Sequence, residues 1–269
     1  MSVPGRWTTR HLSVLGIIAI FAAPGETLAD WHYQAAVEGA WRTVEESEDG
    51  SKLVEETGPS VGAAVSLERS SGDWFVGFTG GIERAELDYD GQTQANAPLA
   101  TDTDWSEGHF GAIVGRRFDG VFARWRGRLE YQWRERDIAS TPDAWGLSES
   151  YRTTWLGLGL MIRPTKTVAF EFDLACAIDS RVDISFAAAL DDAALDVADH
   201  CRIGVEATIK VGRINNSTVF IRPFVAWERY PESSADRLYS GGSPVGQVFL
   251  PATEFVSFGV RIGIGQSPD

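Results

Sequence analysis

The feature that most constrains this chain is an alternation of side-chain character with a period of two residues. Between Val121 and Trp133 every odd position is apolar, aromatic or glycine, while the even positions from Arg124 to Arg134 are charged or polar. A helix would scatter these arginines around its axis, whereas a β-strand places them all on one face. The segment therefore predicts a strand with one apolar wall and one charged wall.

The same alternation recurs along the chain and predicts ten strands. In the first, the odd positions from Trp31 to Trp41 are apolar, aromatic or glycine, and the even ones from His32 to Arg42 are polar or small. Strands of about a dozen residues are long for a soluble protein but suit a tilted crossing of a bilayer. The ten segments cover approximately residues 31–43, 60–69, 74–86, 105–118, 121–136, 150–163, 167–179, 200–212, 218–229 and 252–265.

The expected connections alternate between short and long. Turn-forming residues make the short ones, at 70–73, 119–120, 164–165 and 214–217, and the long ones cover about 44–59, 87–104, 137–149, 180–199 and 230–251. Transmembrane barrels join their strands by tight periplasmic turns and extended outer loops, and a soluble sandwich has no reason to keep this rhythm. We therefore predict an all-β fold, a closed antiparallel transmembrane β-barrel of about ten strands.

Hydropathy and aromatic placement agree with a barrel. The mean hydropathy is −0.13, as expected when each strand alternates between lipid-facing and lumen-facing residues. Aromatic side chains gather near both ends of the expected strands on the lipid-facing side, where interfacial girdles form. The alternative is the aromatic core of a soluble β-protein. These residues are Trp31, Tyr33, Trp74 and Phe118 at the inner ends, and Trp41, Trp133 and Trp227 at the outer ends.

Residues 1–29 are predicted to be a secretory signal peptide, and residues 30–269 the barrel domain. Arg6 and Arg10 precede an apolar run from Leu12 to Ala23, and a small-residue site ends at Ala29. The alternative, a membrane anchor, needs roughly twenty apolar residues, which this run does not provide. We thus expect a chain cleaved near Ala29, exported through the periplasm and inserted in the outer membrane.

The alternation also places many charges inside the expected barrel. A ten-strand barrel is too narrow for a porin-sized bore around such side chains, and buried charges must be paired. We predict a lumen plugged by ion pairs between the arginines and the carboxylates of other strands; the alternative is a narrow cationic channel past the arginines. The residues are Glu38, Arg42, Glu68, Arg117, Arg124, Arg126, Arg128, Glu130, Arg134, Glu171, Asp173, Arg202, Glu206, Lys210, Arg222, Glu228 and Arg261.

Two cysteines and the charge balance bear on possible ligands. Cys176 and Cys201 fall on the lipid-facing side of neighbouring expected strands near the outer rim, so an oxidising periplasm would favour a disulfide between them. Their spacing does not suggest a metal site, and we predict neither a metal nor a cofactor. The net charge of −14 argues against nucleic-acid binding, which needs a basic face.

The last expected strand resembles the assembly signal of outer-membrane proteins. That signal has a polar residue, a glycine two positions on, and two alternating hydrophobic residues, which Ser257, Gly259, Ile262 and Ile264 match. The family usually ends on an aromatic residue, whereas this chain continues beyond Ile264 to Asp269. The resemblance implies the barrel assembly machinery as a partner during biogenesis.

The expected architecture also resembles the omptins, a family of ten-strand outer-membrane proteases. The family implies an Asp-x-Asp pair facing an Asp-x-His pair, which together activate a water molecule. Asp102 and Asp104, followed by a tryptophan, match the first pair, and Asp88 with Asp90 is a second possibility. His200 is the candidate base, but its nearest acid is Asp199, so the family's Asp-x-His spacing is not met. The resemblance implies Asp102, Asp104, Asp199 and His200 as catalytic residues.

Our leading functional hypothesis is a non-enzymatic scaffold that presents acidic outer loops for structural, adhesive or binding work. An omptin-like endopeptidase and a narrow channel are the alternatives. The first long loop could bind divalent cations and bridge neighbouring lipopolysaccharide, or it could be simply solvated. Its acidic residues are Glu45, Glu46, Glu48, Asp49, Glu55 and Glu56.

Overall fold

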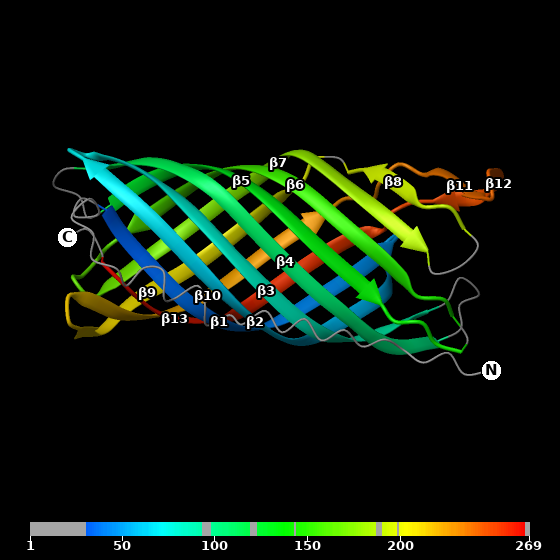
Figure 1. Ribbon diagram of the computed structural model, residues 1–269, viewed down its shortest axis with the longest axis horizontal. Helices are drawn as coiled ribbons and strands as arrows, with labels where there is room; N and C mark the ends of the chain where they lie inside the picture. Colours follow the sequence, from blue (N-terminus) through cyan, green and yellow to red (C-terminus); the bar gives the residue numbers. More distant parts are fainter. Residues whose placement is uncertain are drawn as a thin grey trace. The chain divides into compact units, whose positions relative to one another are not determined.

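The computed structural model describes residues 31–92, 98–118, 123–142, 144–186, 190–197 and 199–266. The predicted signal peptide lies outside these residues. Ten long strands form one closed antiparallel barrel (Figure 1), in which β6 pairs with β7 to complete the ring. The ten are β1 (Trp31–Glu48), β2 (Ser51–Ser71), β3 (Trp74–Gln92), β4 (Pro98–Arg117), β5 (Ala123–Ile138), β6 (Leu147–Ile162), β7 (Val168–Phe186), β9 (Cys201–Ile214), β10 (Ser217–Tyr230) and β13 (Ala252–Gly265).

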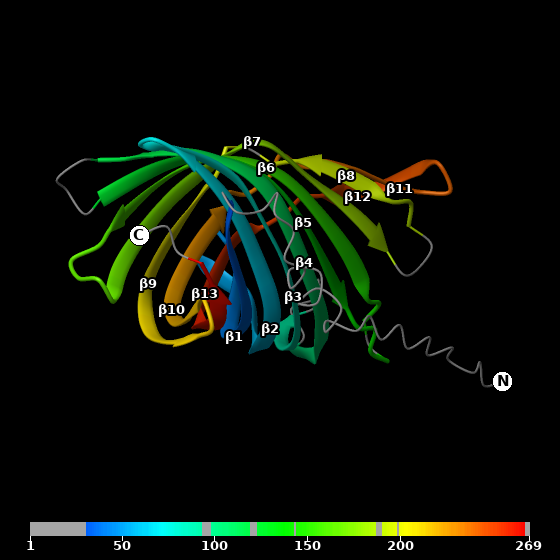
Figure 2. The same ribbon diagram turned by 60° about the vertical axis from the view of Figure 1, so that its left-hand side comes forward.

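The predicted fold class is confirmed, and three shorter strands add to it at the outer end. The strand β8 (Ala193–Asp196) pairs with β7 beyond the ring, and β11 (Asp236–Ser240) forms a hairpin with β12 (Ser243–Val248). Figures 1 and 2 both show β8 beside this hairpin. The Asp191 carboxylate joins them by accepting hydrogen bonds from the backbone N–H groups of Gly241 and Gly242. In the part of the chain described, no helix is long and apolar enough to cross a membrane.

The strands extend well into the segments that we expected to be long loops. Residues 44–59 form the outer ends of β1 and β2, joined by a tight turn at Asp49 and Gly50 with φ of 51° and 76°. Most of residues 87–104 likewise belong to β3 and β4. The prediction of a long first loop was wrong because the alternation continues there with glutamates: Glu46 and Glu56 are buried inside the barrel.

The outer wall of the barrel carries an apolar belt and, beyond it, charge. The belt contains exposed side chains such as Phe110, Leu158 and Phe258, which are 59%, 65% and 55% exposed. Toward the outer end the same wall becomes acidic, and we call the outward carboxylates there the acidic collar. The collar comprises Glu45, Glu55, Glu86, Asp88, Asp90, Asp102, Asp104, Glu135, Asp137 and Glu254.

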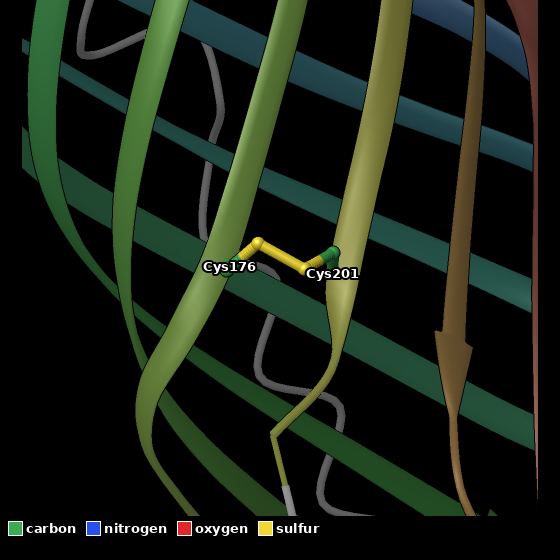
Figure 3. Close-up of a disulfide and its surroundings, with 2 residues drawn as sticks. All are labelled: Cys176 and Cys201. Atoms are coloured by element: carbon green, nitrogen blue, oxygen red, sulfur yellow. A yellow bond between two sulfur atoms is a disulfide. The ribbon is translucent and has the colours of Figure 1, made fainter.

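A disulfide joins two neighbouring barrel strands. Cys176 of β7 and Cys201 of β9 are direct partners in the strand register, and a disulfide links them (Figure 3). Both side chains lie on the outward side of the wall, next to the residues that leave the ring toward β8. The predicted pairing is confirmed.

We expect an arginine in the middle of the apolar belt to destabilise the barrel strongly. Leu158→Arg should lower the free energy of unfolding in lipid bilayers by about 2–4 kcal/mol, because its charge would face hydrocarbon. Ser148→Arg lies on the same face of β6 at the outer end and should cost about 0–1 kcal/mol. Equal effects of both variants would show that the belt does not face lipid.

We expect removal of the disulfide to loosen the outer end of the barrel. The bond closes a loop with a sequence separation of 25 residues. The double variant Cys176→Ser, Cys201→Ser should lose about 3 kcal/mol of unfolding free energy, because its unfolded chain regains loop entropy. Denaturant unfolding of the variant and of the reduced wild type should give the same loss; no loss in either would contradict this expectation.

Candidate functional site

The lumen is the candidate functional site, and arginines of β5 organise its charges. Arg124 pairs with Glu68 of β2 at 3.0 Å. Arg126 reaches across β6 to pair with Glu171 and with Asp173, the latter at 2.9 Å. Arg128 lies 3.5 Å from Glu130 and 4.0 Å from Asp173. The inward face of one strand is thereby connected to β2 on one side and β7 on the other.

A glycine makes the contact between Arg126 and β7 possible. A Cβ atom at Gly159 of β6 would lie 3.0 Å from both Cγ and Nε of Arg126 and 2.8 Å from Oδ1 of Asp173. A side chain at this position would crowd the contact between Arg126 and Asp173. The glycine was visible in the sequence, but its function depends on the register between β5 and β6.

The opposite wall of the lumen carries a second chain of ion pairs. Arg261 of β13 bridges Glu38 at 2.5 Å and Glu206 at 2.8 Å, and Arg222 lies 3.4 Å from Glu206. Farther toward the outer end, Arg202 pairs with Glu130 at 2.5 Å. These contacts join β1, β9, β10 and β13 to β5 across the lumen.

Arg134 lies at the centre of the lumen and combines ionic with aromatic contacts. Its guanidinium pairs with Glu107 and Glu228, each at 3.0 Å. It also lies over the rings of Trp105 and Phe255, 5.0 Å and 4.4 Å from their centroids. Cation–π contacts of this kind are strongest where water is excluded.

Apolar side chains close the lumen on the outer side of Arg134. We call this cluster the apolar plug. Side chains from the barrel wall meet others from the segments that fold over the mouth, where Leu195 and Leu250 are 2% and 1% exposed. The plug consists of Val44, Leu87, Trp105, Tyr151, Val182, Ile184, Leu195, Val197, Tyr230, Leu250 and Phe255.

A buried acidic cluster lies in the part of the barrel that projects beyond the apolar belt. Arg136 is 1% exposed and pairs with three carboxylates: Glu46 at 2.5 Å, Glu56 at 2.7 Å and Glu149 at 2.8 Å. Thr103 donates a hydrogen bond to Glu56. One guanidinium cannot neutralise three ionised carboxylates, so this cluster favours uptake of a proton.

The sequence analysis did not identify this cluster. The available signal was Arg136, the last residue of the fifth expected strand, whose even position places it on the same face as the inward arginines. Glu46 and Glu56 were assigned to a loop, and Glu149 to the end of another. Two further inward glutamates, Glu83 and Glu107, both pair with Arg42. The alternation in the expected strands also placed these two residues on the lumen face.

Between the apolar plug and the short-turn end, the lumen contains a cavity of about 280 Å³. Its walls carry most of the predicted lumen charges, together with Glu83, Glu107 and His109. Arg117 lies nearer the short-turn end and donates a hydrogen bond to Ser70. The cavity therefore lies within an ion-pair network rather than in a continuous bore.

The four residues suggested by the resemblance to omptins are not brought together. Asp102 and Asp104 are exposed on the outer wall of β4, because the alternation there directs Thr103 and Trp105 inward. Asp199 is exposed, whereas His200 is 4% exposed inside the barrel.

His200 packs between aromatic rings. It contacts Trp155 edge-on, with centroids 5.0 Å apart, and lies against Tyr230 at 4.0 Å. Asp88 and Asp90, the second possible acidic pair, are exposed on the outer wall as well. The described residues therefore contain no pairing of His200 with an Asp-x-Asp motif. The structure differs from the expectation at Asp102 and Asp104, because an alternating strand runs where a loop was expected.

Comparison with known proteins identifies the fold. No family model and no curated protein matches the chain. The outer membrane protease OmpT of Escherichia coli matches in structure with a TM-score of 0.55 and 11% identity, over 91% of this chain and 99% of that one. The translocator domain of the autotransporter NalP of Neisseria meningitidis matches with a TM-score of 0.51 and 9% identity, over 94% and 93%. The chain therefore has the fold of an outer-membrane β-barrel.

We expect the cluster around Arg136 to make the outer end more stable at mildly acidic pH. Burial raises the pKa of Glu46; Arg136 opposes this shift, and Glu149 adds to it. The pKa of Glu46 is therefore higher in the folded state than in the unfolded state. The contribution of Glu46 to stability is complete below the unfolded-state pKa and is lost as the pH rises through the folded-state pKa. Burial raises the pKa of Tyr89 to about 12 and that of Tyr151 well above its usual value, so both tyrosines beside the cluster stay neutral in this range.

The free energy of unfolding, measured between pH 4 and 8, tests this expectation. Glu46→Gln should be more stable than wild type at neutral pH and should show a flatter profile, because no charge is lost with pH at this position. Glu45→Gln, which changes the exposed neighbour, is the matched control and should keep the wild-type slope. If the stability of Glu46→Gln changed with pH in parallel with that of wild type, Glu46 would not be the group responsible for the pH dependence.

Proposed function

We propose that this protein is a non-conducting outer-membrane scaffold whose external contacts are made by its outer wall and rim. The observation that carries the proposal is the closed lumen: ion pairs link β5 to the opposite wall beside the cavity, and the apolar plug lies outside them. A conducting channel would need a continuous aqueous path through both layers. An omptin-like protease would need its acids and His200 to meet in one site, and these side chains are on different sides of the wall.

The acidic collar is the surface that we propose for contact with lipopolysaccharide through divalent cations. Its carboxylates are direct cross-strand neighbours, as in the row formed by Glu86, Asp104 and Asp137. Like charges directly opposite each other are destabilising. Burial, followed by Glu135 and Asp104, raises the pKa of Asp137 in this collar. Divalent cations would relieve the repulsion and bridge the collar to phosphate groups of neighbouring lipid.

The sequence at the end of β13 supports the barrel assembly machinery as a partner during biogenesis. Ile262 and Ile264 are on the outward face of β13, 53% and 37% exposed, while Gly259 is on the inward face. This is the alternation that the assembly signal requires. The contact would be transient, since β13 pairs with β1 and β10 once the barrel is closed.

We expect wild-type protein in planar lipid bilayers to show no single-channel conductance. The triple variant Trp105→Ala, Phe255→Ala, Arg134→Ala should conduct, because it removes two large rings from the apolar plug and the guanidinium that links β5 to β10 across the lumen. Phe110→Ala with Phe258→Ala, on the outward faces of the same two strands, is the matched control and should stay silent. Ion conductance by the wild type would overturn the scaffold proposal in favour of the channel.

A further inference from the structure

The short-turn end of the lumen opens into a small hollow lined by basic side chains, which we call the basic vestibule. Five basic residues line it: Arg124 of β5, Arg163 and Lys166 of the turn between β6 and β7, Lys210 of β9 and Arg222 of β10. Its volume is about 30 Å³. Among the described residues that line it, none is acidic.

The carboxylates that pair with two of these arginines lie deeper. Glu68, 3.0 Å from Arg124, and Glu206, 3.4 Å from Arg222, line the larger cavity and not the vestibule. The described lining of the vestibule is therefore basic, in a chain whose net charge is −14. A concave site of one sign with low-dielectric walls concentrates ions of the opposite sign.

Arg222, which pairs with Glu206, is also held in place by two neutral neighbours. Arg222 donates hydrogen bonds from Nε to Thr208 at 2.9 Å and from Nη2 to Gln34 at 2.8 Å. Both partners also line the vestibule. A guanidinium fixed in this way is prepared to bind an anion without a further loss of side-chain entropy.

The vestibule continues into the cavity of about 280 Å³, with which it shares Gln34, Arg124, Met161 and Arg222. An anionic group bound at the mouth could therefore carry a small substituent inward. A large anion such as a nucleic acid would not fit, because the plugged lumen ends the space.

We propose that the basic vestibule binds a small, soluble, phosphate-bearing anion from the periplasmic side of the membrane. Phosphate offers several strong acceptor oxygens to the guanidinium and ammonium groups that line the vestibule, and Arg and Lys are its usual ligands in proteins. The site goes beyond the proposed scaffold role, because it is at the opposite end of the barrel from the collar.

Isothermal titration of the detergent-solubilised protein with inorganic phosphate and with glycerol 3-phosphate, at constant ionic strength, tests this proposal. Wild type should bind both saturably, and glycerol 3-phosphate more tightly if its substituent enters the cavity. The double variant Lys166→Glu, Lys210→Glu should weaken binding at least tenfold. Lys52→Glu with Arg152→Glu makes the same charge change at the outer end and should leave binding unchanged.

Folding of each variant is checked by the heat-dependent gel mobility of the barrel, so that loss of binding is not confused with loss of structure. No saturable binding by the folded wild type would overturn the proposal. Equal weakening by the vestibule and outer-end variants would also overturn it, because it would show general electrostatic attraction. Equal affinities for the two phosphates would keep the vestibule and exclude the cavity as the site of the substituent. Conductance measurements decide the scaffold role independently of these outcomes.

Discussion

The pairing of inward arginines inside a narrow closed barrel is the interaction on which this structure depends. Arg126 and Arg134 face a narrow lumen, where each is paired with carboxylates from other strands. Removing one partner of such a pair costs about 3–5 kcal/mol, because the other charge is left buried and unpaired. The network thus constrains the register of β5 against β7 and β10, while the apolar belt requires only that the opposite faces of the strands be hydrophobic.

The lumen differs in character from one end to the other. The short-turn end is basic, the middle is balanced by cross-barrel ion pairs, and the plug around Trp105 and Tyr230 is apolar. Beyond it, the cluster around Arg136 has an excess of carboxylates. This order separates the two ends of the barrel chemically. Functions at the outer rim and at the short-turn end can therefore be independent of each other.

Much of this fold could be predicted from the sequence, because period-two alternation determines both strand character and the face of each residue. It assigned Arg124, Glu171 and Glu228 to the interior, where the structure shows ion pairs. It failed where acidic residues at the outer end were interpreted as loops. Glu46 and Glu56 alternate with other residues just as the lumen charges do, but their partner Arg136 is about 80–90 positions away in the sequence. Long-range pairing of this kind, and the bulge of β7 against β6, cannot be seen in one sequence without the closed sheet.

The most direct test of the account is a scan of β5 with spin labels, one at a time from position 124 to 134, in lipid bilayers. The account predicts that lipid-soluble oxygen reaches labels at odd positions such as 125, 129 and 133, and does not reach those at even positions. Such a period of two would place the arginines in the lumen. Oxygen accessibility that is uniform along the strand, or greatest at positions 124, 126 and 128, would contradict it.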